Sequence, residues 1–152
     1  MPSIAVSYLY TFVALMAVSG LLIIAFMNYT GAMRVSSELR QLKNLMDQAA
    51  AKSTELLTTS LATNATIEAF IQVPAAIGER EYWLQLRNDS SKAWIEGGLG
   101  NNPTESGAFR VYLPKETSAM GDFIGGHGAL YLSCRLNAGT PAIELSSSSE
   151  SG

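Results

Sequence analysis

The chain has 152 residues, a net charge of −3 and a mean hydropathy of +0.15, which fits one modest domain with an additional segment. No basic block is present, which argues against nucleic acid as a partner because phosphate binding needs clustered lysine and arginine. The single cysteine, Cys134, excludes an internal disulfide and a Cys-x-x-Cys metal site.

The beginning of the chain is apolar. Ile4 to Met27 form a nearly continuous apolar stretch, and the first charged residue is Arg34. As a helix, this stretch would be roughly 36 Å long, enough to cross a hydrocarbon core of about 30 Å. A secretory signal would need a basic start and a shorter apolar run. We therefore predict a membrane-competent helix over residues 4–27, buried in lipid or against other copies of the chain.

The charges beside this helix allow two membrane orientations. Arg34, Arg40 and Lys43 follow the apolar stretch, and basic residues usually mark the cytoplasmic flank of a membrane helix. On that reading, the C-terminal domain would lie in the cytoplasm. The alternative is that a basic leader preceded Met1 and was removed. The Ser, Thr, Asn and Gly content of the remaining chain favours the second reading, with an exported domain.

Small residues recur in the apolar stretch, and they let helix backbones approach closely in an apolar medium. We expect the hydroxyls of Ser7, Thr11 and Ser19 to bond to the helix's own carbonyls. An ordinary single-pass anchor also contains such residues, so that reading stays open. The residues expected to pack in a core of helices are Ala5, Leu9, Val13, Ala17, Gly20, Leu21 and Ile24.

A polar break at residues 28–31 precedes a second helical pattern at residues 32–58. Its apolar stripe recurs at spacings of three and four. We predict one helix of about 55 residues within a segment 1–60. The stripe would pack on the protein's own C-terminal domain or on neighbouring helices as a coiled coil. Its members are Val35, Leu39, Leu42, Met46, Ala49, Ser53 and Leu56.

From about residue 63 the pattern changes to an alternation of apolar and polar residues, which is typical of half-buried strands. Six or seven short antiparallel strands are expected in residues 63–146, followed by a polar tail at 147–152. The predicted fold class is α+β, with a small β-sandwich head after the long helix. The expected strands are residues 66–73, 81–87, 92–96, 108–113, 129–136 and 141–145, separated by turns at 74–78, 88–91, 97–107, 125–128 and 137–139.

The head offers no catalytic constellation, so we predict a non-enzymatic protein without metal or cofactor. His127 is the only histidine and cannot supply a multi-histidine metal site. A nucleophilic pair of Cys134 and His127 is conceivable, but a cysteine in the middle of a strand usually packs in the core. The glycine-rich stretch Gly121–Gly126 resembles a phosphate loop only superficially, since no helix pattern follows it. We interpret it as a tight turn.

Three Asn-x-Ser/Thr sequons predict N-glycosylation, each weakly on its own. Asn64 and Asn88 begin sequons at the edges of predicted strands. Asn28 lies at the end of the apolar helix and would need that point to be outside the membrane.

The layout resembles the type IV pilin superfamily, specifically the archaeal pilins and archaellins. The resemblance rests on the uncharged Ile4–Met27 helix, its amphipathic continuation and the all-β head. Within the head, the stretch Gln72–Leu86 is similar to a recurring archaeal pattern of strand, Pro, Ile-Gly, Tyr and second strand. Ala5 stands where bacterial pilins carry Glu, and a single cysteine cannot form their C-terminal disulfide. Both departures favour the archaeal branch.

The resemblance implies a secreted subunit of a filament whose core consists of apolar helices and whose surface consists of β heads. It implies a short basic leader, cleaved by a prepilin peptidase, and membrane insertion before the pilus machinery assembles the filament. The alternative is a membrane-anchored accessory or stator-type protein with an extracytoplasmic β-sandwich that binds an envelope protein. A membrane-anchored enzyme is disfavoured because no site is visible.

Overall fold

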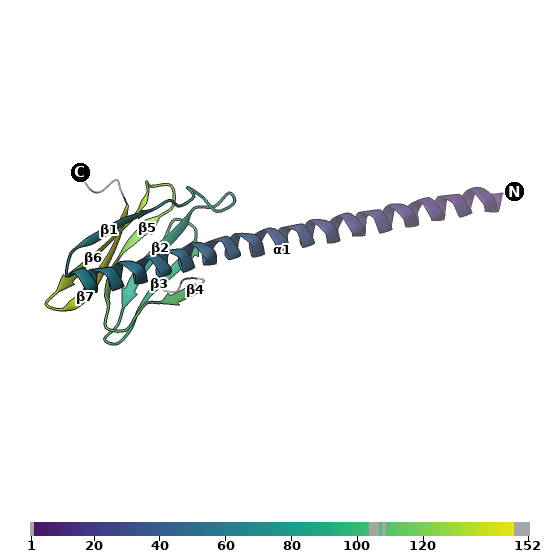
Figure 1. The fold of residues 1–152 in the computed structure, drawn as a ribbon. Helices are drawn as coiled ribbons and strands as arrows, with labels where there is room; N and C mark the ends of the chain where they lie inside the picture. The colour runs from purple at the N-terminus through teal and green to yellow at the C-terminus, as the bar shows by residue number, and fades with distance from the viewer. Residues whose placement is uncertain (1, 104–106, 108, 148–152) are drawn as a thin grey trace. The chain divides into compact units, whose positions relative to one another are not determined.

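In the computed structural model, which describes residues 2–103, 107 and 109–147, one long helix precedes seven strands (Figure 1). This confirms the α+β class with a long N-terminal helix. The chain divides into an N-terminal unit, up to Ser37, and a head unit, from Glu38 onwards. The elements are α1 (Pro2–Thr63), β1 (Ile67–Ile71), β2 (Tyr82–Asn88), β3 (Ala93–Leu99), β4 (Phe109–Tyr112), β5 (Ser118–Ile124), β6 (Leu130–Asn137) and β7 (Thr140–Ser147).

Helix α1 has 62 residues and includes residues 28–31, where a polar break was expected. The hydroxyl of Thr30 donates a hydrogen bond to the carbonyl of Phe26 one turn earlier. A threonine that bonds to its own helix leaves the backbone ladder intact, so these polar residues do not end the helix. The helix ends at Thr63, and Asn64 follows in the left-handed conformation with φ 52°. Asparagine is one of the few residues that adopts this helix-ending geometry readily.

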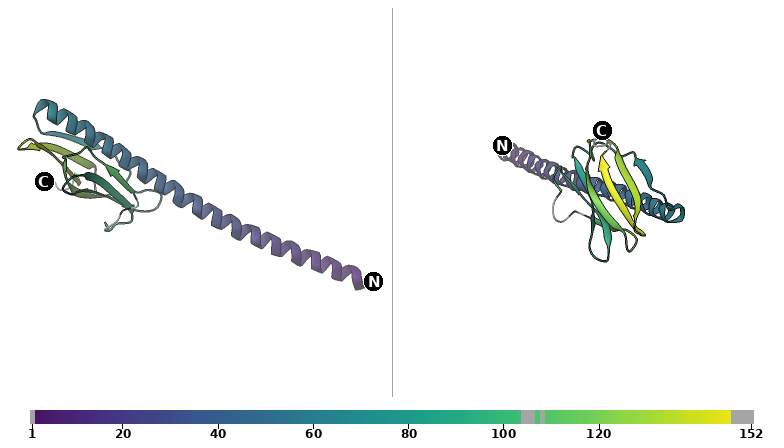
Figure 2. Two further views of the ribbon diagram at one scale, coloured as in Figure 1. Left: turned by 90° about the horizontal axis from the view of Figure 1, so that it is seen from below. Right: turned by 90° about the vertical axis from the view of Figure 1, so that its left-hand side faces the viewer.

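The seven strands form one sheet in the order β1-β6-β7-β5-β2-β3-β4, and Figure 2 shows them side by side in its right-hand view. All neighbouring pairs are antiparallel except β5 and β7, which are parallel. The head is therefore not the pair of stacked sheets that a sandwich requires. Its second layer is the C-terminal half of α1, whose apolar stripe covers one face of the sheet.

Strand β5 lies partly in a stretch that we expected to be a tight turn. Its first half, to Gly121, pairs with β7, and its second half, from Asp122, pairs with β2. Ala119 and Phe123 point inward, but Gly121 occupies the inward position between them without a side chain. Because this glycine has no side chain, the sequence lacks the alternation of apolar and polar residues that is typical of a strand. The turn prediction for Gly121–Ile124 was wrong.

Strand β3 likewise continues through Gly97 and Gly98, which were expected to lie in a turn. A Cβ atom on Gly97 would approach the sulfur of Met46 to 2.9 Å, so the strand can pass this close to the helix only with glycine. Ala108, the expected first residue of the next strand, lies outside the described residues. At the other end of the chain, β7 includes Ser147, and the remaining predicted tail also lies outside them.

The core lies between α1 and the inner face of the sheet. The predicted helical stripe is confirmed for Leu42, Met46, Ala49, Ser53 and Leu56, all at most 4% exposed. It packs on the protein's own strands and is not free for a coiled coil in this region. The strand residues that face it include Leu84, Ile95, Phe123, Leu132, Cys134, Ile143 and Leu145.

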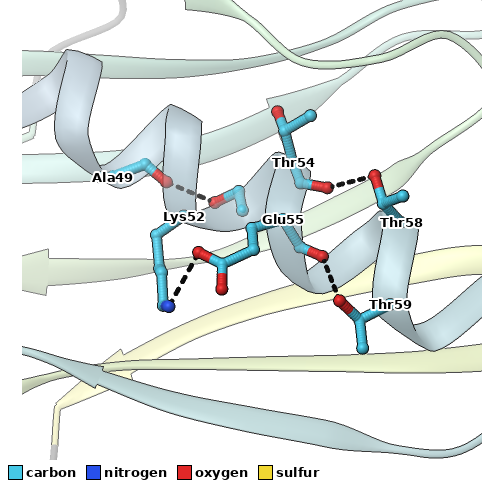
Figure 3. A network of polar contacts seen from close by, with 7 residues as sticks. Ala49, Lys52, Thr54, Glu55, Thr58 and Thr59 are labelled. Atoms are coloured by element: carbon cyan, nitrogen blue, oxygen red, sulfur yellow. Dashed lines mark hydrogen bonds and ion pairs between the residues drawn. The ribbon is translucent and has the colours of Figure 1, made fainter.

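The half of α1 in the head unit is rich in serine and threonine, and several of their hydroxyls bond within the helix (Figure 3). Ser53 is fully buried and donates to the carbonyl of Ala49 at 2.7 Å. Thr58 and Thr59 do the same from the exposed side. Ser60, which is also fully buried, donates instead to the carbonyl of Ala65 just beyond the helix at 2.8 Å, so both buried serines have an acceptor against the sheet.

Truncation of Met46 is expected to destabilise the head by about 3 kcal/mol, because its fully buried side chain would leave a cavity between α1 and β3. The Met46→Ala variant would be unfolded with urea in detergent and followed by fluorescence of the two tryptophans, both of which lie in the sheet. Met16→Ala is the matched control, since Met16 is 63% exposed. Equal losses in the two variants would contradict the packing of α1 on the sheet.

Candidate functional site

The most unusual surface of the chain is the N-terminal unit. Every described side chain from Ser3 to Ser37 is exposed, apart from the partly exposed position of Gly20. Its large apolar residues are between 42% and 74% exposed, with Tyr8, Leu21 and Phe26 among the most accessible. An 18-residue window of α1 has a mean hydropathy of 2.3, so the helix is long and apolar enough to cross a membrane. Such a surface is compatible with membrane insertion, because water disfavours contiguous apolar area of this extent.

The seven residues expected to pack in a helix core all lie on this exposed helix. Leu9, Val13, Leu21 and Ile24 are 56–67% exposed, and a Cβ atom on Gly20 would meet nothing within 4 Å. At 100° per residue, Ala5, Ala17 and these five positions fall within an arc of about 160°. The geometry therefore brings them to one broad side of the helix and gives them no partner within the described part of a single chain. Their role in packing stays a prediction.

Two of the three hydroxyls expected to bond to the helix's own carbonyls do so. The hydroxyl of Thr11 donates to the carbonyl of Ser7 at 3.0 Å, and that of Ser19 to Leu15 at 2.8 Å. These bonds confirm the expectation for the two hydroxyls. A donor paired within its own helix costs little in an apolar surrounding, whether lipid or protein. The segment can therefore change from one apolar environment to another without exposing an unpaired hydroxyl at these positions.

The two candidate nucleophilic residues show no catalytic arrangement. Cys134 lies on the inner face of β6 at 0% exposure, and burial raises the pKa of its thiol. The reactive thiolate is therefore disfavoured. His127 is exposed in the turn after β5, where its backbone N–H donates to Ile124. Within the described residues, no group of three or more His, Cys, Asp and Glu side chains is placed to hold a metal ion.

A charged cluster on the outer face of the sheet was not anticipated from the sequence. Glu96 on β3 is fully buried, and its carboxylate lies 2.6 Å from Nε of Arg110 on β4 and 3.2 Å from Nε of Arg87 on β2. The bond to Glu96 raises the pKa of Arg110. Arg110 also lies over the ring of Trp94 at 5.3 Å. A carboxylate between two guanidinium groups joins three strands, and we interpret the cluster as structural.

The sequence contained a signal for this cluster. Arg87, Glu96 and Arg110 each occupy an outward position of a predicted strand, and opposite charges on one face favour neighbouring strands. The pattern alone does not specify which strands are neighbours, so it does not bring the three side chains together.

The three sequons fall in different settings. Asn64 follows the last residue of α1 and Asn88 ends β2, and both are exposed. After Asn88, the carboxylate of Asp89 accepts backbone hydrogen bonds from Ser91 and Lys92 at 2.8 and 2.7 Å, which lowers its pKa. Asn28 lies inside α1, between apolar residues. Glycosylation of each site remains a prediction.

Tyr82 provides a pH-dependent contribution to stability. Its ring is fully buried, its hydroxyl donates to the carbonyl of Pro74 at 2.7 Å, and burial raises its pKa from 10.0 to about 12. The unfolded state then releases the phenolic proton at lower pH than the folded state does. The stabilising contribution is complete below pH 10 and is lost between pH 10 and 12, and its size is roughly 2–3 kcal/mol.

The Tyr82→Phe variant should lack this loss. At neutral pH we expect it to be less stable by about 1 kcal/mol, because the Pro74 carbonyl loses its donor. Urea unfolding of both proteins between pH 9 and 12 measures the difference. Lysine deprotonation affects both proteins alike, so a difference that stays constant over this range would contradict the assignment.

No protein-family model matches the chain, and neither the curated proteins nor the solved structures give a match.

Proposed function

We propose that this chain is the structural subunit of an extracellular type IV pilus-like filament. In this proposal the apolar helices of many copies form the core of the filament, and the β heads form its outer surface. The observation that carries the proposal is the exposed apolar helix from Ser3 to Met33, which has no charged side chain. The likeness in layout to archaeal pilins and archaellins supports the same assignment.

Apolar burial provides the driving force. Each large apolar side chain of the N-terminal unit gains about 1.5–3 kcal/mol when it leaves water. Lipid supplies most of that gain, so assembly moves the helix from the bilayer into a bundle of its own copies. The net gain must then come from packing, for which the small side chains at Ala5, Ala17 and Gly20 permit close approach.

In the head unit, α1 has a structural function, because it forms part of the core. The inner face of the sheet is already covered by α1 from Leu42 to Ser60, so the apolar surface of the sheet needs no further helix. By the family likeness, we propose insertion in the membrane before assembly, removal of a leader by a prepilin peptidase, and extraction by a pilus assembly machinery. The product would be a filament at the cell surface.

Electron microscopy of material sheared from cells tests the proposal, with the chain identified by mass spectrometry in the same fraction. We expect filaments that contain it. Recovery of the chain only from detergent-solubilised membranes, as a monomer, would refute the filament and favour the membrane-anchored accessory or stator-type protein.

A bulky residue on the packing side provides a second test. Gly20→Phe should prevent filament formation, because a phenylalanine ring would separate helices that approach at this point. Ala51→Phe is the matched control, since Ala51 is exposed and lies outside the apolar segment. Normal filaments from the Gly20→Phe variant would contradict close helix packing there.

A further inference from the structure

The sheet of the head unit ends in two strands, β1 and β4, whose outer edges pair with no other strand among the described residues. An unpaired edge offers alternate N–H and C=O groups to another strand. Edge strands are commonly protected by proline, lysine, a bulge, short length or charged side chains. β1 and β4 contain neither proline nor lysine, and their protection is limited to short lengths of 5 and 4 residues and one charged side chain each. Both edges are therefore able to accept a further strand.

The two edge strands have matching patterns of side chains. On the outer face, β1 carries Glu68 followed two residues later by Phe70, and β4 carries Arg110 followed two residues later by Tyr112. The charges are opposite, and both next positions are aromatic. Phe70 is 66% exposed and Tyr112 is 60% exposed, which places them among the most exposed large side chains of the head.

The inner sides of both edge strands are incompletely covered. Ile67, Ala69 and Ile71 of β1 are only partly buried, as are Phe109 and Val111 of β4. Inward residues in the middle of the sheet, by contrast, such as Leu84, Ile95 and Ile143, are at most 1% exposed. A strand added at either edge would bury more apolar area on the face toward α1.

The directions of the strands decide how two heads can meet. Of the six neighbouring pairs in the sheet, only β5 and β7 are parallel, so β1 and β4 of one head run in opposite directions. A second head placed beside the first in the same orientation therefore brings its β1 antiparallel to the β4 of the first. Antiparallel pairing is the more stable arrangement per residue.

We propose that β1 of one copy pairs antiparallel with β4 of the next copy, so that the sheets of neighbouring heads join edge to edge. This inference rests on the proposed filament and names a second contact within it. The register with the greatest overlap sets Glu68 opposite Tyr112 and Phe70 opposite Arg110 on the outer face. Ala69 then meets Val111, and Ile71 meets Phe109, on the inner face.

This register satisfies the side chains on both faces. Within its own head the Glu68 carboxylate is hydrogen-bonded to Tyr131. Across the join, the same carboxylate lies opposite Tyr112 and diagonally from Arg110, within reach of long side chains. Arg110, which keeps its ion pair with Glu96 and its place over the Trp94 ring, lies opposite Phe70 across the join. Because the two joined surfaces are different, the contact is head to tail, and it stays open where the rotation between successive heads does not close a ring. Such contacts propagate into open helical assemblies, as a filament requires.

Disulfide trapping tests the pairing in assembled, full-length protein. Directly opposed antiparallel residues are close enough for a disulfide, so filaments of the Glu68→Cys, Tyr112→Cys double variant should give a ladder of cross-linked multimers after oxidation. A mixture of the two single variants should give dimers only. Neither substitution removes a partner of the Arg110–Glu96 ion pair. Native Cys134 is fully buried and therefore does not compete for disulfide formation.

Two controls set the specificity. The double variant Glu68→Cys, Asp122→Cys should give no ladder, because Asp122 is exposed but lies on the central strand β5. Dimers from either single variant alone would show like edges meeting and would overturn the head-to-tail pairing.

Hydrogen exchange of the unmodified protein gives a second measurement that depends on no substitution. Backbone amides of β1 and β4 should exchange about tenfold or more slowly in filaments than in detergent-solubilised monomers, with β7 unchanged. Filaments without cross-links and without this protection would overturn the edge pairing and leave the proposed function standing. If microscopy of the wild-type sample shows no filaments, the proposed function fails, and the pairing fails with it.

Discussion

The Leu21→Lys variant is expected to form no filaments while its head remains folded. Leu21 is 67% exposed in the middle of the apolar segment, so the substitution disturbs nothing within a single chain. A lysine near the centre of a bilayer costs about 2.5–3.5 kcal/mol on insertion scales. In a bundle of helices the cost recurs in every subunit, because each ammonium group would be buried without a partner.

The measurement is the yield of sheared filaments by electron microscopy, together with urea unfolding of the head followed by tryptophan fluorescence. We expect filaments below detection and a head stability within about 0.5 kcal/mol of the wild type. Asn44→Lys is the control, since Asn44 is an exposed polar position on the half of α1 in the head unit. Wild-type filament yield from the Leu21→Lys variant would argue against a helix core.

The Gly121→Val variant should unfold the head. Gly121 has a φ of +111°, and a Cβ atom there would overlap the carbonyl oxygen of Leu145, its partner on β7. The left-handed backbone alone costs a branched residue about 1–3 kcal/mol. The overlap forces β5 away from β7, so we expect a total loss of at least about 4 kcal/mol, a large part of the stability of an ordinary domain.

Gly139→Val separates these two contributions. Gly139 has a φ of +86°, but a Cβ atom there meets nothing within 4 Å. It should lose only the conformational part, about 1–3 kcal/mol. Tryptophan fluorescence during urea unfolding would follow both variants, and equal losses would show that the contact with Leu145 is unimportant.

The two experiments separate the two units of the chain. Substitution at Leu21 addresses assembly without loss of the head, and substitution at Gly121 addresses the head without a change in the apolar segment.

The long helix was predictable because its pattern is local. An uncharged apolar stretch followed by a stripe at three- and four-residue spacing requires only the helical period, and the structure places Leu42, Met46 and Leu56 in the core as expected. The strands with strict alternation, such as β1 and β2, were predictable for the same reason. Strand β5 was missed because Gly121 interrupts its inward positions, and a missing side chain leaves no period to detect.

The sequence by itself determined the class of the fold, the membrane-competent helix and the residues on the side of that helix that carries Ala5, Ala17 and Gly20. These follow from composition and from periodicity along one element. Only the tertiary structure decided the rest. It showed one sheet covered by α1 in place of two stacked sheets, the burial of Glu96 between Arg87 and Arg110, and the opposite directions of β1 and β4. These features depend on which distant segments become neighbours, and that order arises from packing of the whole head, which no local pattern encodes.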